Sequence, residues 1–211
     1  YAALEYGTFN AVDATAAFGG PIVEDKLAFR IAAQYAEDDG FSTNAATGHD
    51  VNFTEQYAVR GSLLFTPDSD TDVLFTVNRF MNRGGAVQPK SRALFPSVPE
   101  AAGPDGVCAP NAYRSGLCTD LLGYADTNPA PYKVDSNLEG LDKVDLTSLM
   151  LSVDRSVGDM TLTSITAWQD VKRNAQENTD SSPLQMIESS YINQQTEFSQ
   201  ELRLASDVGA L

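Results

Sequence analysis

Few residues in this chain of 211 have the types and spacing that chemistry requires. Cys108 and Cys118 lie ten positions apart, and they could act as a thiol nucleophile, a metal-binding pair or a disulfide. The acidic residues in the run 68–72 alternate as they do in a calcium loop. Val73 and Arg79, however, occupy the positions where such a loop needs glycine and an acidic side chain. We therefore interpret this run as a solvated turn.

Catalytic and cofactor motifs are also missing from the sequence. The one histidine, His49, has no acid or nucleophile at a recognisable spacing, and we read it as a surface residue. There is no Gly-x-Ser-x-Gly elbow and no phosphate-binding glycine loop. With 14 Lys and Arg against 29 Asp and Glu, the net charge of −15 argues against nucleic acid. We expect neither an enzyme nor a bound cofactor or metal.

The elements that carry these residues are strands. From Leu27 to Ala36, apolar side chains alternate with small, polar or charged ones, which places the two sets on opposite faces of a strand. The pattern returns several times, and nothing comparable repeats every 3.6 residues. The sequence predicts an all-β fold with eight strands, at 2–9, 12–19, 26–37, 55–66, 72–82, 144–156, 160–173 and 194–206.

The connections between these strands alternate between short and long. Tight turns are predicted at Gly19-Gly20-Pro21 with Glu24-Asp25, at 67–70, at Gly158-Asp159 and at Ser206-Asp207. Long loops are predicted at 37–53, 82–142 and 172–193. Tight turns at one end and long loops at the other are typical of an antiparallel transmembrane β-barrel. No uncharged apolar run approaches the roughly 18 residues of a spanning helix, whereas ten-residue strands suffice for a barrel.

Three stretches resemble the TonB-dependent receptors of the Gram-negative outer membrane. The first is Tyr6-Gly7-Thr8-Phe9-Asn10 followed by residues 19–30, with Asp38-Asp39-Gly40-Phe41 as the exit into an outer loop. The second is the run 60–67, Arg-Gly-Ser-Leu-Leu-Phe-Thr-Pro. The third combines residues 162–168 with residues 198–206. In order and spacing they resemble the first hairpins of the receptor barrel.

The resemblance implies a barrel of 22 strands around a plug, of which residues 1–211 would form the N-terminal part. No coupling box, plug domain or aromatic C-terminal strand end is present in the sequence, and the chain begins at Tyr1 without methionine. We therefore expect a piece of a longer outer-membrane receptor. The implied partners are the TonB-ExbB-ExbD complex, outer-membrane lipid and a scarce ligand. A ferric siderophore is the commonest ligand of such receptors, and cobalamin and oligosaccharides are others.

At such a cell surface, which is oxidising, we expect Cys108 and Cys118 to form a disulfide that closes a small loop. The charged residues Arg30, Arg60, Glu201 and Arg203 lie opposite the apolar sides of their strands, so they would face the lumen and either pair with the plug or line a ligand path.

Aromatic residues divide into two groups. Tyr35, Phe41, Tyr57 and Trp168 fit an interfacial girdle, with sugar or chelate stacking as the alternative. The loop tyrosines Tyr113, Tyr124, Tyr132 and Tyr191 are better placed to bind a ligand, and nothing in the sequence selects among them.

Two other classes of protein share some of these features. A passive porin would have the same strand pattern without energy coupling. A soluble β-rich surface domain that binds glycans would explain the aromatic residues and the acidity. Liposome swelling and cell fractionation would separate these two classes from the receptor.

Overall fold

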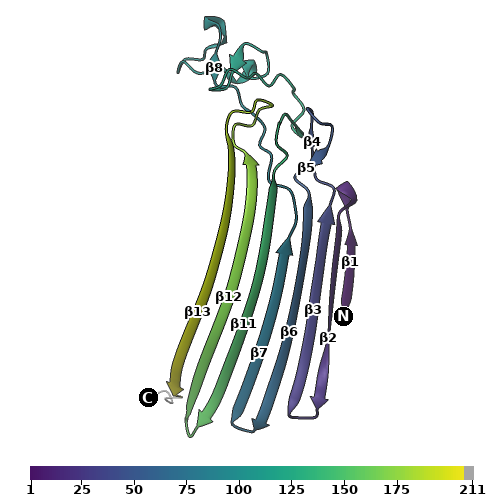
Figure 1. The fold of residues 1–211 in the computed structure, drawn as a ribbon, viewed down its shortest axis with the longest axis vertical. Helices are drawn as coiled ribbons and strands as arrows, with labels where there is room; N and C mark the ends of the chain where they lie inside the picture. Colours follow the sequence, from purple (N-terminus) through teal and green to yellow (C-terminus); the bar gives the residue numbers. More distant parts are fainter. Residues whose placement is uncertain (207–211) are drawn as a thin grey trace.

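The main body of the molecule is one antiparallel sheet of eight strands, drawn in Figure 1. The structure is a computed structural model that describes residues 1–206. In sheet order the strands are β1 (Ala2–Tyr6), β2 (Val12–Val23), β3 (Leu27–Asp38), β6 (Thr54–Asp68), β7 (Thr71–Asn82), β11 (Leu141–Val157), β12 (Met160–Asn178) and β13 (Glu188–Ser206). The eight strands pair in the order in which they follow along the chain, and the short strands of the loops take no part, so the sheet is a meander. The all-β prediction and all eight predicted strands are confirmed.

Short elements occupy the loops at one end of the sheet. The strands β4 (Ser42–Asn44) and β5 (Asp50–Val51) pair with each other, and β10 (Lys133–Val134) joins β4 in parallel. The strands β8 (Phe95–Pro96) and β9 (Cys118–Thr119) form a second small pair. Single 3₁₀ turns are η1 (Thr8–Asn10), η2 (Pro99–Ala101) and η3 (Pro110–Ala112). Among residues 1–206, no helix is long and apolar enough to span a membrane.

The predicted alternation of tight turns and long loops is confirmed. Residues 24–26, 69–70 and 158–159 connect their strands at one end of the sheet, which is the lower end in Figure 1. The segments 39–53, 83–140 and 179–187 connect strands at the opposite end. The predicted turn at Ser206-Asp207 continues past Ser206 and lies outside the described residues.

The prediction of a long loop over 172–193 is wrong. Strands β12 and β13 stay paired up to Asn178 and Glu188, so only residues 179–187 form the loop. The paired segments 172–178 and 188–193 are polar on both faces. Because polar side chains stand on both faces of this part of the hairpin, among them the buried Asn178, the period-two apolar signal is absent although the backbone ladder continues.

Two predicted boundaries near the N-terminus are also wrong. The turn expected at Gly19-Gly20-Pro21 is strand, and β2 continues to Val23 with a register shift between Pro21 and Val23. Within residues 1–206, β1 pairs with β2 only up to Ala16, so Pro21 lies on an edge without a partner strand there, where proline is tolerated. The strand expected over 2–9 stops at Tyr6, because residues 8–10 form η1 with positive φ at Phe9.

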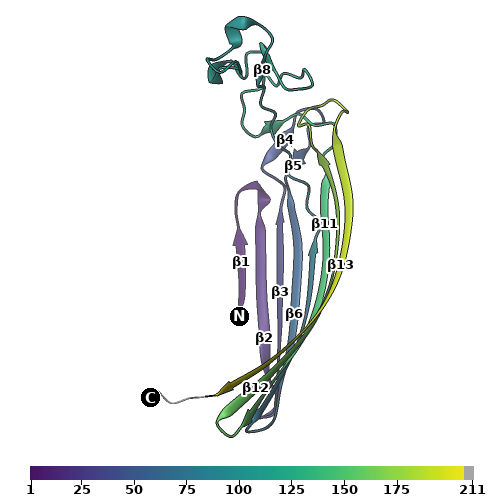
Figure 2. The same cartoon turned by 90° about the vertical axis from the view of Figure 1, so that its left-hand side faces the viewer.

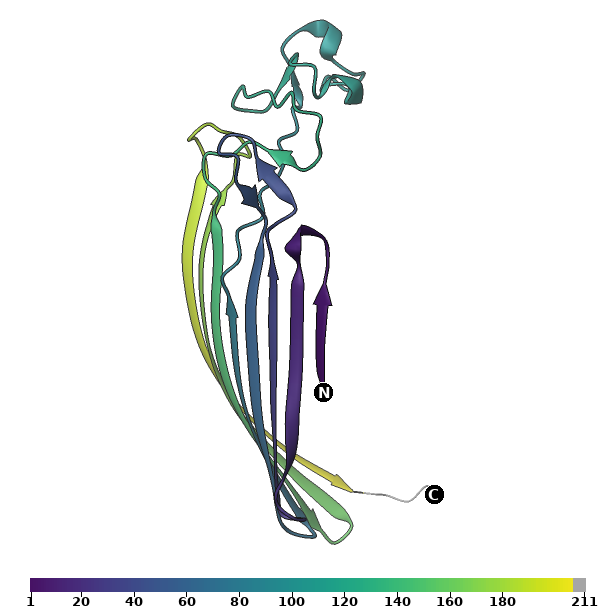
Figure 3. The same ribbon diagram turned by 90° about the vertical axis from the view of Figure 1, so that its right-hand side faces the viewer.

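The sheet is curved and open. Figures 2 and 3 show the strands bowing to one side along their length. Strand β1 pairs only with β2 and β13 only with β12, so two long edges have no partner strand among residues 1–206. The described residues form a single layer, and most of the fully buried side chains lie in the outer loops. Such a sheet resembles a section of a barrel wall rather than a packed sandwich.

Candidate functional site

The strand register separates the side chains into two faces. Arg30 is opposite Ser62 and Arg60 is opposite Asn78, and these pairs continue across the sheet to Ser199 and Glu197. The four charged residues singled out in the sequence, Arg30, Arg60, Glu201 and Arg203, therefore share one face. A hollow of about 490 Å³ on this side is lined chiefly by residues of that face, including Gln34, Arg60, Asn78, Ser148 and Gln169. We call this side of the sheet the concave face.

One row of polar side chains crosses the concave face at a single height. Arg60 Nε donates to Asn78 Oδ1 at 2.6 Å, and Asn78 Nδ2 donates to Ser148 Oγ at 2.9 Å. Gln169 lies opposite Ser148, and its Nε2 donates to Glu197 Oε2 at 2.8 Å. The row spans five strands, β6 to β13. Sequence reasoning found only Arg60, although the alternation of β7 already places Asn78 on this side.

The other predicted charges lie away from this row. The Arg30 guanidinium is 6.0 Å from the ring centroid of Tyr1, near the N-terminal edge. Arg203 Nη2 donates to Glu201 Oε1 at 2.5 Å on β13, the opposite edge strand. The four residues thus share a face but do not converge on one point. Their role as lumen-facing residues stays a prediction.

The opposite face, which we call the convex face, is apolar over most of its height. Phe18 and Phe29 contact edge to face with ring centroids 5.1 Å apart, and Leu149 lies between Val77 and Trp168 in the register. Many of these side chains are exposed, among them Phe198 at 70%. An exposed apolar surface of this extent marks contact with another protein or with lipid.

The upper limit of the apolar surface runs obliquely across the sheet. The rings of Tyr35 on β3 and Tyr57 on β6 are tilted against each other with centroids 5.0 Å apart, and Trp168 on β12 lies opposite Phe198 on β13. The residues directly across the sheet from Tyr57 are Lys172 on β12 and Gln194 on β13. On their strands they lie four positions closer to the loop end than Trp168 and Phe198. The aromatic limit thus shifts by four residues, at about 3.3 Å each, while it crosses three to five strands spaced about 4.8 Å apart. If this limit is parallel to the membrane plane, the strands tilt by about 30–45° from the membrane normal. Strands of a closed barrel tilt by a similar angle.

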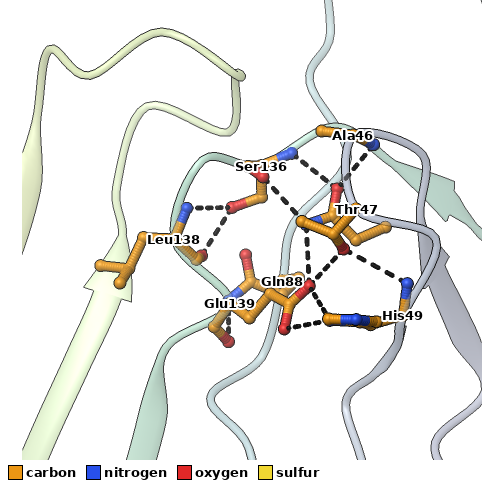
Figure 4. A network of polar contacts seen from close by, with 8 residues as sticks. Ala46, Thr47, His49, Gln88, Ser136, Leu138 and Glu139 are labelled. Carbon is orange, nitrogen blue, oxygen red and sulfur yellow. Dashed lines mark hydrogen bonds and ion pairs between the residues drawn. The ribbon is translucent and has the colours of Figure 1, made fainter.

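The three outer loops are tied together by a polar network, and Figure 4 shows its part between the loops 39–53 and 83–140. Buried Asn44 donates to the Ser136 carbonyl at 2.9 Å and accepts from the Ser136 N–H at 3.1 Å, across 92 positions of sequence. Asn178, also buried, donates to Ser136 Oγ at 2.8 Å and to the Ser182 carbonyl at 2.8 Å. Ser136 therefore joins the loops 39–53, 83–140 and 179–187. No sequence signal connects residues so far apart.

A second part of the network contains His49. Its Nδ1 lies 3.2 Å from the Glu139 carboxylate, which also accepts from Thr47 Oγ1. The hydrogen bond from Thr47, supported by His49, lowers the pKa of Glu139. Gln88 Nε2 donates to the Glu139 carbonyl at 2.7 Å. His49, read as a lone surface residue in the sequence, thus lies against the long loop.

Part of the long loop forms a compact lobe, residues 90–127. Cys108 and Cys118 are joined by a disulfide with Cα atoms 6.2 Å apart, and they pack with Ala93 and Ala101 as a small core. Asp126, 2% exposed, pairs with Lys90 at 3.0 Å and Arg114 at 2.6 Å. The lobe rises beyond the strand ends and leans toward the side to which the strands curve (Figures 2 and 3).

The four tyrosines predicted in the loops differ in what their side chains do, and one of them, Tyr191, lies in strand β13 rather than in a loop. Burial, with a hydrogen bond to Asp135, raises the pKa of Tyr124, and the Tyr191 hydroxyl donates to Glu177 at 3.1 Å. The ring of Tyr113 stacks on the Arg92 guanidinium at 4.3 Å. Tyr132 is 60% exposed, and its ring contacts that of Phe41, which lies in a loop beyond β3. Tyr132 is thus the one of the four most open to a ligand.

The acidic turn 68–72 has local partners. Asp68 accepts from the Asp70 N–H at 3.0 Å and pairs with Arg155 at 3.2 Å, and Asp72 accepts from Thr66 at 2.9 Å. Within residues 1–206 no group of three or more His, Cys, Asp or Glu side chains is placed to hold a metal ion.

Comparison with known proteins relates this geometry to solved receptors. The chain matches no family model, and no curated protein matches it significantly. Among solved structures it is similar to the ferric yersiniabactin uptake receptor FyuA from Yersinia pestis, with 18% identity and a TM-score of 0.67. It is also similar to the open form of the ferric-catecholate import receptor Fiu from E. coli K12, with 14% identity and a TM-score of 0.59.

The similarity extends over nearly the whole chain and a minor part of each receptor. It covers 97% of this chain in both comparisons, but only 27% of the first receptor and 30% of the second. The chain thus spans less than a third of the length of either protein. Its fold is that of a segment of the barrel of TonB-dependent receptors, as the resemblance in sequence predicted.

Proposed function

We propose that this chain is part of an outer-membrane TonB-dependent receptor that takes up a scarce ligand, a ferric siderophore, with energy coupling. The observation that carries the proposal is the two-sided curved sheet. Its convex face is apolar up to an oblique aromatic limit, and its concave face carries the polar row from Arg60 to Glu197. A barrel wall between lipid and an aqueous interior needs this division.

We further propose that residues 1–211 are one part of the barrel domain, with the plug and the remaining strands supplied by other sequence. Both edges of the sheet, β1 and β13, have unpaired backbone groups over residues 1–206. Unpaired backbone groups are very costly in hydrocarbon, so a membrane requires the sheet to be closed by further strands. The TonB-ExbB-ExbD complex would act on the region outside this chain.

The outer loops suit the capture of a ligand. The network around Ser136 holds three loops as one unit, and the disulfide-linked lobe overhangs the concave side. Two solved ferric-siderophore receptors of the same fold support iron as the cargo. Tyr132 in the loops and Arg60 on the wall are the residues we expect nearest to the ligand path. No chemical step on the ligand is proposed.

Uptake of a radiolabelled ferric siderophore tests this function. Cells that express the complete protein should accumulate iron, and deletion of TonB or collapse of the proton gradient should abolish the accumulation. Uptake that persists without coupling, together with swelling of liposomes, would instead indicate a passive porin. Recovery of the complete protein in the soluble fraction without detergent would refute the barrel placement and favour a glycan-binding surface domain.

A further inference from the structure

The polar row across the concave face carries little charge. Two amides and a hydroxyl form its middle, and Arg60 and Glu197 form its ends. Two hollows, of about 490 and 680 Å³, share the three middle residues. Arg79 also borders the first hollow, but its side chain lies on the convex face, where it pairs with Asp145. Within residues 1–206, Arg60 and Glu197 are therefore the charged side chains that face the two hollows.

Carboxylates without a basic partner stand on this face beside and above the row. Glu5 and Asp13 lie opposite each other on β1 and β2, and Asp13 accepts from the Gln34 amide at 3.0 Å. Glu197 accepts from two glutamine amides, and Glu177, higher on β12, accepts from a tyrosine hydroxyl. None of these four carboxylates lies within 4.0 Å of a basic group of residues 1–206. They are therefore free to act on a ligand through their charge.

The cations of the concave face are fewer, and half of them are paired. Arg173 donates from Nε and Nη2 to both oxygens of one aspartate, at 2.7 and 2.9 Å, and Arg203 donates to a glutamate. Arg30 and Arg60 have no carboxylate within 4.0 Å among residues 1–206, and Arg30 is turned toward the ring of Tyr1. Two free cations thus stand against four free carboxylates. Tight binding of an anionic chelate needs several arginine or lysine side chains that converge on it.

The outer loops carry an excess of the same negative sign. Together the three loops contain nine Asp and Glu residues against five Lys and Arg residues. Two of the five cations share the buried Asp126, and Arg83 pairs with Asp145. Within residues 1–206, this leaves Arg92 and Lys133 as the loop cations without a carboxylate partner. An anion that approaches the mouth from outside is therefore repelled by this surface, whereas a cation is attracted.

We propose that the ligand of this receptor is an uncharged or cationic ferric chelate rather than an anionic one. The neutral amides and hydroxyl of the polar row suit a polar chelate surface, and the free carboxylates favour positive charge. Hydroxamate groups can balance the charge of Fe³⁺, whereas catecholate groups exceed it and leave an anion. This inference rests on the proposed function, and it adds the charge class of the ligand.

A series of chelates that differ in charge tests the inference. A linear ferric trihydroxamate with a terminal amine is cationic, its N-acetyl derivative is neutral and its N-succinyl derivative is anionic. Binding of each to the detergent-purified complete protein is measured by quenching of the protein fluorescence. We expect the Kd to rise by about threefold for each unit of negative charge, about tenfold over the series. The difference should nearly vanish at about 1 M salt, where the screening length is about 3 Å.

Two pairs of substitutions locate the charges that discriminate. Asp13→Asn with Glu197→Gln removes two free carboxylates and no ion pair, and it should reduce the tenfold difference to about threefold. The matched control is Glu24→Gln with Asp159→Asn, two exposed carboxylates in tight turns at the other end of the sheet. The control should keep the full difference. An equal change in both double variants would show that net charge acts without the concave face and would overturn the inference.

Uptake by cells separates this inference from the function on which it rests. Equal binding of the three chelates, or tightest binding of the anionic one, would overturn the charge class. Energy-coupled uptake of a ferric catecholate in place of the trihydroxamates would do the same, and the receptor function would stand. Absence of coupled uptake of every ferric chelate would instead refute the siderophore as the cargo.

Discussion

Neighbouring residues of β11 offer a sharp test of which face meets lipid. Leu151 lies on the convex face opposite Phe75 and Thr166, and Met150 lies on the concave face opposite Thr76 and Ala167. The substitutions Leu151→Arg and Met150→Arg introduce the same side chain one position apart on the same strand. They differ only in the face that receives the charge and in the shape of the apolar side chain that is lost.

The expected difference follows from the position of Leu151 along the strand. On the convex face of β11, the polar residues nearest to it are Arg155 below and Thr147 above, each four positions away. At about 3.3 Å per residue and a tilt of about 40°, each lies about 10 Å from Leu151 along the membrane normal, which places Leu151 near the midplane. Arginine at the midplane of a barrel costs about 2–4 kcal/mol, whereas we expect about 1 kcal/mol or less on the concave side, where water reaches the side chain.

The assay is reversible urea unfolding of the complete protein in phosphatidylcholine vesicles, followed by the gel mobility shift between folded and unfolded barrels. Leu151→Arg should lower the free energy of unfolding by about 3 kcal/mol, more than a hundredfold in the folding equilibrium. Met150→Arg is the internal control for the loss of an apolar side chain. Equal destabilisation by both substitutions, or a larger effect of Met150→Arg, would refute the assignment of the convex face to lipid.

Three further predictions concern the outer loops. Replacing Cys108 and Cys118 by serine should destabilise the lobe by about 2–3 kcal/mol, because the disulfide closes a short loop. Thermal proteolysis of the lobe measures this loss of stability, and unchanged cleavage would contradict the prediction. Asn44→Ala should weaken the attachment of the loops by about 1–3 kcal/mol, since it leaves the buried N–H and carbonyl of Ser136 without these partners. Hydrogen exchange at the loop amides should then rise, and unaltered exchange would rule this out. The pKa of Glu139 is lowered from its ordinary 4.5, so its contribution is complete above about pH 4.5 and is lost as the pH falls through the lowered value. Loop exchange should rise in that acid range in the wild type, and Glu139→Gln should remove this pH dependence.

Much of the fold could be predicted because the signal for a strand is local. The alternation from Leu27 to Ala36 fixes both the strand and its two faces, since side chains point to opposite sides with a period of two. The prediction failed where both faces of a strand carry polar side chains. Residues 172–178 have no apolar alternation, yet hydrogen bonds to β13 keep them in the strand.

The candidate site was predicted only in part. The face of a strand on which a residue lies follows from the local sequence, whereas its neighbour on the next strand depends on the register. Alternation placed Arg60 opposite the apolar side of β6, but its partner Asn78 is known only from the register of β6 with β7. His49 and Glu139 are 90 positions apart, and neither segment contains a sequence signal that predicts their contact.

The sequence by itself determined the existence of the eight strands, the faces of those that alternate, the order of short and long connections and a resemblance to receptor barrels. The tertiary structure decided the register, the tilt, the open edges over residues 1–206 and the loops joined at Ser136. The physical reason is the range of the forces involved. Alternation depends on the two sides of a single strand, whereas contacts between strands and loops depend on backbone hydrogen bonds that bring distant residues to the same height.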